Sequence, residues 1–247
     1  MQLGFFISGV AGQMAQGKLD NISNNLANAN TTGFLEDRVA FSSLMSNKMG
    51  RNGTPDQTSS AFLSMNRQYV STQAGSIRHT GNDYDFAIRG DGYFRVRMNN
   101  GQQALTRAGN FKIDADGNLL TQGNLPVLDQ SGSPIKLTAG AVSATENGTI
   151  YVNGQPAADL GVTMLKDERQ IHKVAGVLIT TPASNLAKPD KTISVLQGSL
   201  EDSNVNSIKL MAQMIDTMRS YQSMMKIVQQ YDQQAGMLNN KVGTVQG

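Results

Sequence analysis

The 247-residue sequence predicts an α+β fold, with an α-helix at each end of the chain and an antiparallel β domain between them. Near both termini, apolar residues recur at steps of three and four, which is the spacing of one face of a helix. Between residues 76 and 192 the apolar spacing changes to two, and Asn-Gly and Asp-Gly pairs recur, as in antiparallel strands joined by tight turns. An extended connector is expected to join the first helix to this β domain.

The first segment, residues 1–34, is predicted to form an N-terminal assembly helix. Its apolar residues follow two lines, which are Leu3, Ile7, Val10 and Met14, and then Ala15, Leu19, Ile22, Leu26 and Ala29. Four glycines interrupt these lines, and each costs roughly 0.5–1 kcal/mol relative to Ala in a helix interior. The helix is therefore expected to need a packing partner. We expect it to end near Thr31, because Gly33 suits the left-handed conformation that follows a helix.

The second segment, residues 35–75, is predicted to be a connector made of a loop and an extended β segment. Residues 50–60 are rich in Gly, Ser, Thr and Asp and show no apolar periodicity, which is typical of a loop. The third segment, residues 76–192, is the predicted β domain. Its strand signals include Phe94–Met98 and Thr149–Val152, and its turn signals are Asn100-Gly101, Asp116-Gly117, Asn147-Gly148 and Asn153-Gly154.

The last segment, residues 193–247, is predicted to contain a return connector and a C-terminal assembly helix. Either Ser203 or Asn204 could cap this helix with its side-chain oxygen. A first seam at steps of three and four consists of Met214, Thr217, Tyr221, Met224, Val228, Tyr231, Ala235, Leu238 and Val242. A second seam consists of Ile208, Met211, Ile215, Met218 and Met225. Two apolar seams on one helix imply two sets of neighbours.

The composition excludes several classes of function. The chain has no Cys and two His, so thiolate metal sites, three-histidine metal sites and a cysteine nucleophile are excluded, and no cofactor or metal is expected. Its formal net charge is +2 with scattered basic residues, so neither nucleic acid nor an anionic membrane surface is an expected partner. No window approaches the roughly 18–20 apolar residues of a membrane-spanning helix. Asn, Gln, Ser and Thr make up close to a third of the residues, which favours an elongated protein that completes its core against neighbours.

Four short motifs occur in order along the chain. The first is Asn-Asn-Leu-Ala-Asn at residues 24–28 followed by Thr-Gly-Phe at 32–34, and the second is Asp-Phe-Ala-Ile-Arg-Gly-Asp-Gly-Tyr-Phe at 85–94. The third is Leu-Thr-Arg-Ala-Gly-Asn-Phe at 105–111 leading into Asp-Gly-Asn-Leu at 116–119, and the fourth is Gly-Ser-Leu-Glu-Asp-Ser-Asn-Val-Asn at 198–206. With these motifs the whole chain resembles the axial proteins of the bacterial flagellar basal body, which are the rod and hook subunits.

This resemblance implies a structural subunit of the basal-body rod, which polymerises through coiled-coil-like terminal helices into a hollow shaft that transmits torque across the periplasm. The length and the single central domain resemble a rod protein more than a hook subunit. The segment from Phe34 to Gly90 is short and lacks a Gly-rich stretch, and Met218-Arg219-Ser220-Tyr221 departs from the distal type. Both features favour the proximal rod protein, with the distal rod protein second.

The resemblance also implies the partners and the location. The partners are further copies of the chain, other rod proteins and, during secretion, the flagellar export apparatus; a small-molecule substrate and direct membrane insertion are not expected. The chain is expected in the basal body, exported without a cleaved signal peptide, with terminal segments that become ordered on assembly. The predicted subunit-interface residues are Leu19, Ile22, Asn24, Asn25, Leu26, Asn28, Asn204, Val205, Met214, Tyr221, Met224, Val228, Tyr231 and Leu238.

The asparagines of the first helix have two interpretations. A buried amide without a partner costs about 1–3 kcal/mol, so paired amides at an interface would fix one register and penalise others. The alternative is that these side chains face solvent or the water inside a channel. We favour the interface, because a tube that repeats one contact propagates any error of register.

Two other classes of function were considered. Arg89-Gly90-Asp91 spells an adhesion tripeptide, so the runner-up is a secreted β-domain protein that binds a ligand through residues 89–93; a hairpin turn is the simpler interpretation. Asp83, Asp85 and Asp91 could suggest a cation site or a glycan hydrolase, but their spacing fits no calcium loop. The two His residues lie far apart without a nucleophile motif, so the sequence predicts no catalytic residues and no enzyme.

Overall fold

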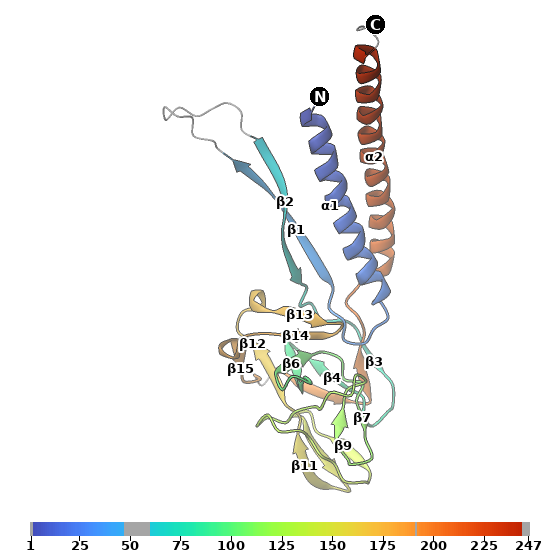
Figure 1. The fold of residues 1–247 in the computed structure, drawn as a ribbon. Helices are drawn as coiled ribbons and strands as arrows, with labels where there is room; N and C mark the ends of the chain where they lie inside the picture. The colour runs from blue at the N-terminus through green and yellow to red at the C-terminus, as the bar shows by residue number, and fades with distance from the viewer. Residues whose placement is uncertain (1, 47–59, 191, 244–247) are drawn as a thin grey trace, which may run out of the picture. The chain divides into compact units, whose positions relative to one another are not determined.

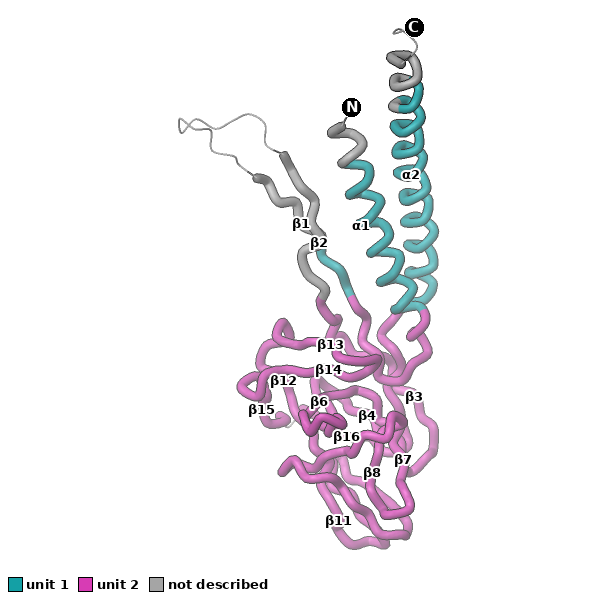
Figure 2. The backbone as a smooth tube through the Cα atoms, viewed as in Figure 1, with its two compact units in different colours: residues 1–26, 38–68, 206–247 teal, residues 27–37, 69–205 magenta. Residues whose placement is uncertain are grey.

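The computed structural model describes residues 2–46, 60–190 and 192–243, and it confirms the α+β class. Helix α1 (Gln2–Ala27) precedes a β-rich central region, and helix α2 (Ser207–Gly243) follows it (Figure 1). The chain forms two compact units, and each is discontinuous in sequence (Figure 2). Unit 1 contains Met1–Leu26, Arg38–Gln68 and Asn206–Gly247, and unit 2 contains Ala27–Asp37 and Tyr69–Val205. No helix among the described residues has both the length and the apolar character needed to cross a membrane.

Unit 1 consists of the two terminal helices and most of a two-stranded sheet. Helix α1 contacts α2, because the Sδ of Met225 lies 4.0 Å from the position that a Cβ on Gly12 would occupy. The missing side chain of Gly12 therefore gives a long methionine room beside α1. Strands β1 (Asp37–Ser46) and β2 (Ser60–Val70) pair with each other, so the predicted connector is a two-stranded ribbon. Nearly all of the predicted loop at 50–60 lies outside the described residues.

Helix α1 ends earlier than the sequence predicts. Its last residue is Ala27, whereas the prediction places the end near Thr31. The chain turns directly after the helix, where Thr31 donates its backbone N–H to Asn28 O and its Oγ1 hydroxyl to Asn28 Oδ1. Gly33 does adopt the left-handed conformation, with φ at 65°, but it lies too far beyond Ala27 to be the C-cap. A tertiary contact, described below, explains its conformation.

Helix α2 begins later than either predicted cap allows. It starts at Ser207, and Asn206 is the N-cap, since its Oδ1 accepts a hydrogen bond from Lys209 N at 3.0 Å. The prediction of Ser203 or Asn204 as the cap is therefore wrong. The side chain of Asn204 is bound elsewhere in unit 2, and Ser203 Oγ accepts a hydrogen bond from Val205 N before the helix starts.

Unit 2 is built on a six-stranded sheet in the order β13-β14-β6-β5-β12-β15. The sheet contains β5 (Gly92–Arg97), β6 (Gln103–Thr106), β12 (Val162–Leu165), β13 (His172–Ala175), β14 (Leu178–Thr180) and β15 (Leu186–Ala187). A three-stranded sheet has the order β11-β10-β9, from β9 (Val142–Ala144), β10 (Thr149–Val152) and β11 (Gln155–Asp159). All the strand pairs recorded among the described residues of unit 2 are antiparallel.

Three two-stranded ladders complete unit 2. Strand β3 (Ile77–His79) pairs with β17 (Ser199–Glu201), β4 (Phe86–Arg89) pairs with β16 (Ser194–Gln197), and β7 (Lys112–Ile113) pairs with β8 (Leu119–Leu120). The stretch expected as a return connector thus supplies β16 and β17 to unit 2. All four predicted turns place their glycine at a positive φ, between 79° and 87°.

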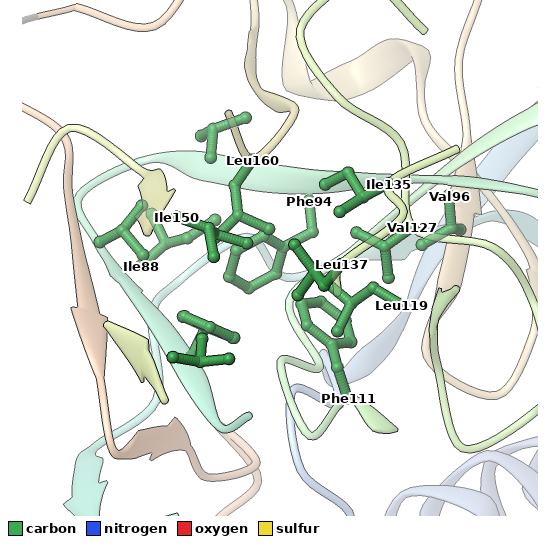
Figure 3. Close-up of a cluster of buried hydrophobic side chains, with 14 of the residues drawn as sticks. Ile88, Phe94, Val96, Phe111, Leu119, Val127, Ile135, Leu137, Ile150 and Leu160 are labelled. Carbon is green, nitrogen blue, oxygen red and sulfur yellow. The ribbon is translucent and has the colours of Figure 1, made fainter. Parts of the chain in front are cut away.

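The main core of unit 2 is a cluster of buried hydrophobic side chains that includes Phe94 and Val96 of β5 (Figure 3). Phe94 and Phe111 pack edge to face with ring centroids 5.1 Å apart, a favoured geometry for aromatic pairs. Around them are buried aliphatic side chains from segments between Ile88 and Val195, including Ile88, Leu119, Val127, Ile135 and Ile150. A second, smaller cluster contains Leu35, Tyr93, Leu105, Ile171 and Ile179. Alternate residues of β5 therefore serve the two clusters, as its period of two predicts.

Candidate functional site

The best-defined polar site in the described structure is a buried junction, formed by Gly33, Gly75, Gly90, Arg107 and Glu201. All five residues belong to unit 2. Gly33 lies in the segment that follows α1 in the sequence, and Glu201 lies in the segment that precedes α2. The junction therefore fixes the two chain segments from which the terminal helices continue.

At the centre of the junction, Arg107 and Glu201 form a buried ion pair. The Nη1 of Arg107 lies 3.3 Å from Oε2 of Glu201, and the two side chains are 1% and 2% exposed. Arg107 Nη1 also donates to Gly90 O at 2.9 Å, and its guanidinium carbon lies 4.7 Å from the centroid of the Tyr93 ring. A guanidinium so buried is stable only with such partners, because an uncompensated buried charge is very costly.

The other half of the junction is made by backbone groups. Gly33 N donates to Glu201 O at 2.8 Å, and Gly75 N donates to the Oε1 of Glu201 at 2.9 Å. A Cβ on Gly33 would lie 2.2 Å from Ala108 N, and one on Gly75 would lie 1.9 Å from Asp202 O. Both positions require glycine because the backbones touch there, and Gly33 in addition has a positive φ. Glu201 therefore binds the backbone at Gly33 and at Gly75 and also pairs with the guanidinium of Arg107.

Asn204 extends the junction toward the start of α2. Its Oδ1 accepts a hydrogen bond from Glu36 N at 2.7 Å, and its Nδ2 donates to Ser71 O and Gln73 O at 3.1 and 2.7 Å. One amide therefore ties the segment before α2 to the residue that precedes β1 and to two residues that follow β2. Because these three hydrogen bonds lie within the subunit, they explain why Asn204 does not cap the helix.

Lys173 on β13 binds the segment that leads into β1. Its Nζ donates to Leu35 O at 2.7 Å and to Asp37 Oδ2 at 3.0 Å, and it lies 3.6 Å from the centroid of the Phe34 ring. A cation over an aromatic face contributes roughly 0.5–2 kcal/mol, and more when it is desolvated. Lys173 therefore fixes the course of the chain between α1 and β1.

Burial shifts the pKa values of the charged groups in this region. Burial raises the pKa of Glu201 above its ordinary value, opposed by the charge of Arg107 and by the hydrogen bond from Gly75 N. Burial also lowers the pKa of Lys173, opposed by the hydrogen bond to Asp37. In both cases the cost of desolvation exceeds the stabilisation of the charge, which is typical of buried ion pairs that serve to fix a geometry.

The junction brings together all four sequence motifs. Gly33 comes from the first motif, Gly90 and Tyr93 from the second, Arg107 from the third, and Glu201 and Asn204 from the fourth. Sequence reasoning did not identify Arg107 or Glu201 as functional residues. The available signal was a lone charged residue, Arg107, in the third motif and the Glu201-Asp202 pair in the fourth, which is weak because charged residues are usually exposed.

The predicted interface residues of the helices divide between buried and exposed positions. On α1, Ile22 and Asn25 are buried, Leu19 and Leu26 are half-buried, and Asn24 is exposed; Asn28, which directly follows the helix, is half-buried. The members of the first seam of α2 that were predicted at the interface and are described, Met214, Tyr221, Met224, Val228 and Tyr231, are all half-buried. Val205 is half-buried as well, and the side chain of Leu238 lies outside the described residues. Their roles between subunits remain predictions.

The second seam of α2 lies exposed in the single chain. The exposed fractions are 80% for Ile208, 49% for Met211, 54% for Ile215, 53% for Met218 and 37% for Met225. Large apolar side chains repeated on one helix face in this way mark an interaction surface, whereas single exposed apolar residues need no explanation. The other side of the helix carries the two buried side chains described on α2, Leu210 and Thr217.

Comparisons with known proteins decide the family. Three family models match in order along the chain: "Flagella basal body rod protein" over residues 9–34, "Flagellar hook protein FlgE/F/G D1 domain" over 87–152, and "Flagellar basal body rod FlgEFG protein C-terminal" over 196–241. The flagellar basal-body rod protein FlgF of Rhizobium meliloti is 31% identical over 251 residues, which cover 100% of this chain and 99% of that protein. The chain belongs to the flagellar basal-body rod protein family.

Both rod types occur among the similar proteins. FlgF of Mesorhizobium japonicum is 30% identical over 93% of each chain, and FlgG of Bacillus subtilis is 31% identical over 92% of this chain and 94% of its own length. The protein is therefore a structural subunit of the flagellar basal-body rod. It is not an enzyme, since the family models and relatives describe structural rod proteins.

In this rod subunit, residues of the adhesion-like tripeptide and of the aspartate group make structural contacts within the fold. The carbonyl of Gly90, inside the adhesion-like tripeptide, accepts the hydrogen bond from Arg107, so this turn is part of the junction. Asp85 is buried, and its carboxylate accepts hydrogen bonds from Thr80 Oγ1 and Asn82 Nδ2 at 2.7 and 3.1 Å. The positions of Gly90 and Asp85 are therefore explained by contacts within the fold, and no bound ligand is needed to explain them.

The asparagines of α1 also have distinct environments in the rod subunit. Asn25 is 1% exposed and donates its Nδ2 to Asn21 Oδ1 at 3.3 Å, whereas Asn24 is exposed on another side of the helix. The amides therefore do not act as one set. Asn25 is paired with Asn21 of its own helix, so the role of these amides in fixing a register between subunits remains a prediction.

Proposed function

We propose that this rod subunit polymerises through α1 and α2 into the wall of a hollow, torque-transmitting shaft, with the second seam of α2 covered by a helix of a neighbouring subunit. The observation that carries the proposal is the exposed repeat of Ile208, Met211, Ile215 and Met218 on a helix whose opposite side packs within the subunit. Full burial of such a side chain contributes about 1.5–3 kcal/mol. Several of them covered together would hold a neighbour firmly.

The first apolar line of α1 is a suitable occupant of that seam. Ile7 is 55% exposed, and Val10 and Met14 are only half-buried in the single subunit. The two lines share the same spacing of three and four residues, so they can interlock as in a coiled coil. Other rod proteins of the family carry related terminal segments, and they would act as partners at the ends of the stack of copies.

A charge placed on the second seam tests this proposal. Ile215→Asp should abolish incorporation into the rod and swimming, because a carboxylate would be buried against the neighbour without a partner. The fold of the free subunit should be unaffected, since Ile215 is already 54% exposed. Incorporation is measured in purified basal bodies and motility in soft agar, in a strain that lacks its own copy.

Ser220→Asp is the matched control, because it adds the same charge at an exposed position of the same helix that lies off both seams. It should leave rods and swimming intact. Normal rods in the Ile215→Asp strain would refute the assignment of the second seam. Loss of rods in both strains would show that α2 rejects any added charge, and the seam would then have no special role.

We further propose the proximal, FlgF-type position in the rod. The FlgF relative from R. meliloti aligns over the whole chain, and the segment between Phe34 and Gly90 lacks the Gly-rich stretch expected in the distal type. Electron microscopy of basal bodies with a tag at residues 50–60 tests the position. The label should lie on the cell-proximal side of the FlgG segment, and a label along the distal segment would refute the proposal.

Export would follow the flagellar type III route, with no cleaved signal peptide. Support comes from membership of the flagellar rod protein family, since a rod protein aligns with this chain over its whole length. Peptide mapping of the subunit from purified basal bodies should recover the segment before Lys18. A new N-terminus within the mature protein would contradict this route.

A further inference from the structure

Three methionines form a regular series on the second seam of α2. Met211, Met218 and Met225 are spaced seven residues apart, and they are 49%, 53% and 37% exposed in the subunit. The methionines of the first seam, Met214 and Met224, are half-buried instead. Met237, which belongs to neither seam, is 58% exposed and should react as fast as Met218. We propose that Met211 and Met218, and more slowly Met225, are oxidation sites in the unassembled subunit, and that their oxidation blocks assembly. This consequence for assembly rests on the proposed role of the second seam.

The chemistry needs only an accessible thioether and a peroxide. The methionine sulfur attacks one oxygen of hydrogen peroxide, the O–O bond breaks, the sulfur gains an S=O bond, and water is released. The sulfur loses two electrons and the peroxide gains them. Exposure controls the rate of this reaction, so the half-buried sulfurs of the first seam should react more slowly. Met225 should react at an intermediate rate, because its Sδ lies against α1 beside Gly12.

The product changes the surface that a neighbour must cover. A sulfoxide converts a flexible apolar side chain into a polar one, and such oxidation disrupts methionine-rich interfaces. The added oxygen would need a hydrogen-bond donor once buried, and the seam side chains Ile208, Met211, Ile215 and Met218 include no donor. Assembled copies should resist oxidation, because the neighbour would cover the same sulfurs.

The first experiment maps the reaction on the free, full-length subunit treated with hydrogen peroxide. Peptide mass spectrometry should show sulfoxide at Met211 and Met218 several-fold faster than at Met214 and Met224. Equal rates at both seams would overturn the site assignment. Rods purified before treatment should show a clear loss of reactivity at Met211 and Met218, and undiminished reactivity there would overturn the claim of protection on assembly.

The second experiment measures the consequence in cells that lack their own copy. The variant Met211→Gln/Met218→Gln/Met225→Gln imitates the polar sulfoxide and should lose incorporation and swimming. The variant Met211→Leu/Met218→Leu/Met225→Leu keeps the seam apolar and should keep both. Purified subunit oxidised at Met211 and Met218 should fail to join subunit assemblies, and methionine sulfoxide reductases A and B should restore it.

The outcomes separate this inference from the proposed function. If Ile215→Asp blocks assembly but the oxidised subunit and the Gln variant assemble normally, the seam is an interface and the oxidation proposal is wrong. If Ile215→Asp also assembles normally, the seam itself is wrong. A triple Leu subunit that loses assembly on peroxide treatment would place the sensitive residue elsewhere.

Discussion

Arg107 and Glu201 make the junction depend on two charges that water cannot reach. Each side chain is at most 2% exposed, and Arg107 Nε and Nη2 have no hydrogen-bond partner in the described part of the chain. The pair is therefore not fully compensated, which agrees with the raised pKa of Glu201. Its contribution is geometric: removing either partner leaves the other charge buried alone.

We predict that Arg107→Met destabilises the protein by about 3–5 kcal/mol, the usual cost of breaking a buried ion pair from one side. The double variant Arg107→Met/Glu201→Gln should recover a substantial part of this loss, because no unpaired charge remains and Gly75 N keeps its acceptor. Equilibrium urea unfolding followed by circular dichroism measures both. A double variant no more stable than Arg107→Met would show that the charge of Glu201 is not the source of the loss.

Residue-level sequence reasoning found the glycine of the junction but not its charges. Thr32-Gly33-Phe34 predicts a left-handed glycine, and Gly33 has one, but for a different reason: its N–H binds Glu201 O and its Cα faces Ala108. Arg107 looks like a surface residue in the sequence because its partner lies 94 positions away. Long-range pairs of this kind leave no local pattern.

At the scale of elements, the turn between β7 and β8 shows how a side chain sets a turn. Asp114 Oδ1 accepts hydrogen bonds from Asp116 N and Asn118 N, and its Oδ2 accepts one from Asn118 Nδ2. The hydrogen bond from the Asn118 side chain is the main cause that holds the pKa of Asp114 below its ordinary value of 3.8. The ionised carboxylate is therefore the form that the folded turn prefers.

This gives a prediction for stability against pH. A lowered folded pKa means a stabilising contribution that is complete above the unfolded value near 3.8 and is lost as the pH falls through the folded pKa. Asp114→Asn should therefore lower the melting temperature at neutral pH, and the gap to the wild type should close on acidification. Asp116→Asn removes the same charge from an exposed neighbour and is the matched control for a general effect of lost charge. A constant difference for Asp114→Asn at every pH would contradict the role of the carboxylate.

Strands and turns were predicted better than helix ends. Apolar alternation locates β5 and β10 to within a residue or two, because side chains that alternate between two faces leave a local pattern. The N-cap of α2 was predicted at the wrong residue because Ser203, Asn204 and Asn206 are all good capping residues. Only the tertiary bonds of Asn204 to Glu36, Ser71 and Gln73 decide that Asn206 caps the helix.

At the scale of the whole molecule, the two units differ in how many of their side chains are buried. Strands β4 and β5 lie almost entirely inside unit 2, whereas Leu210 and Thr217 are the buried residues among the described side chains of α2. A helix with so little burial depends on packing that one subunit supplies only in part. The periodicities of the sequence predict helices at the two ends and strands between them, but they could not show that β16 and β17 belong to unit 2.

We therefore predict that the backbone amides of α2 exchange with solvent much faster than those of β4 and β5 in the free subunit. Hydrogen exchange with mass spectrometry on a sample shown to be monomeric measures the difference, and the strands act as the internal control. On assembly the exchange of α2 should slow sharply. Equal protection of α2 and β5 in the monomer would contradict a helix that awaits its neighbours.

The late position of Glu201 and Asn204 has a consequence for partial chains. Glu36 N and Asn204 Oδ1 meet across 168 positions, and β3 and β4 find their partners only in β17 and β16. A polypeptide that emerges N-terminus first, whether from a ribosome or a secretion channel, cannot form these contacts until about four-fifths of its residues have emerged. Prematurely terminated products would lack the partner strands of β3 and β4, so proteases could distinguish them from finished copies before any reached the growing rod.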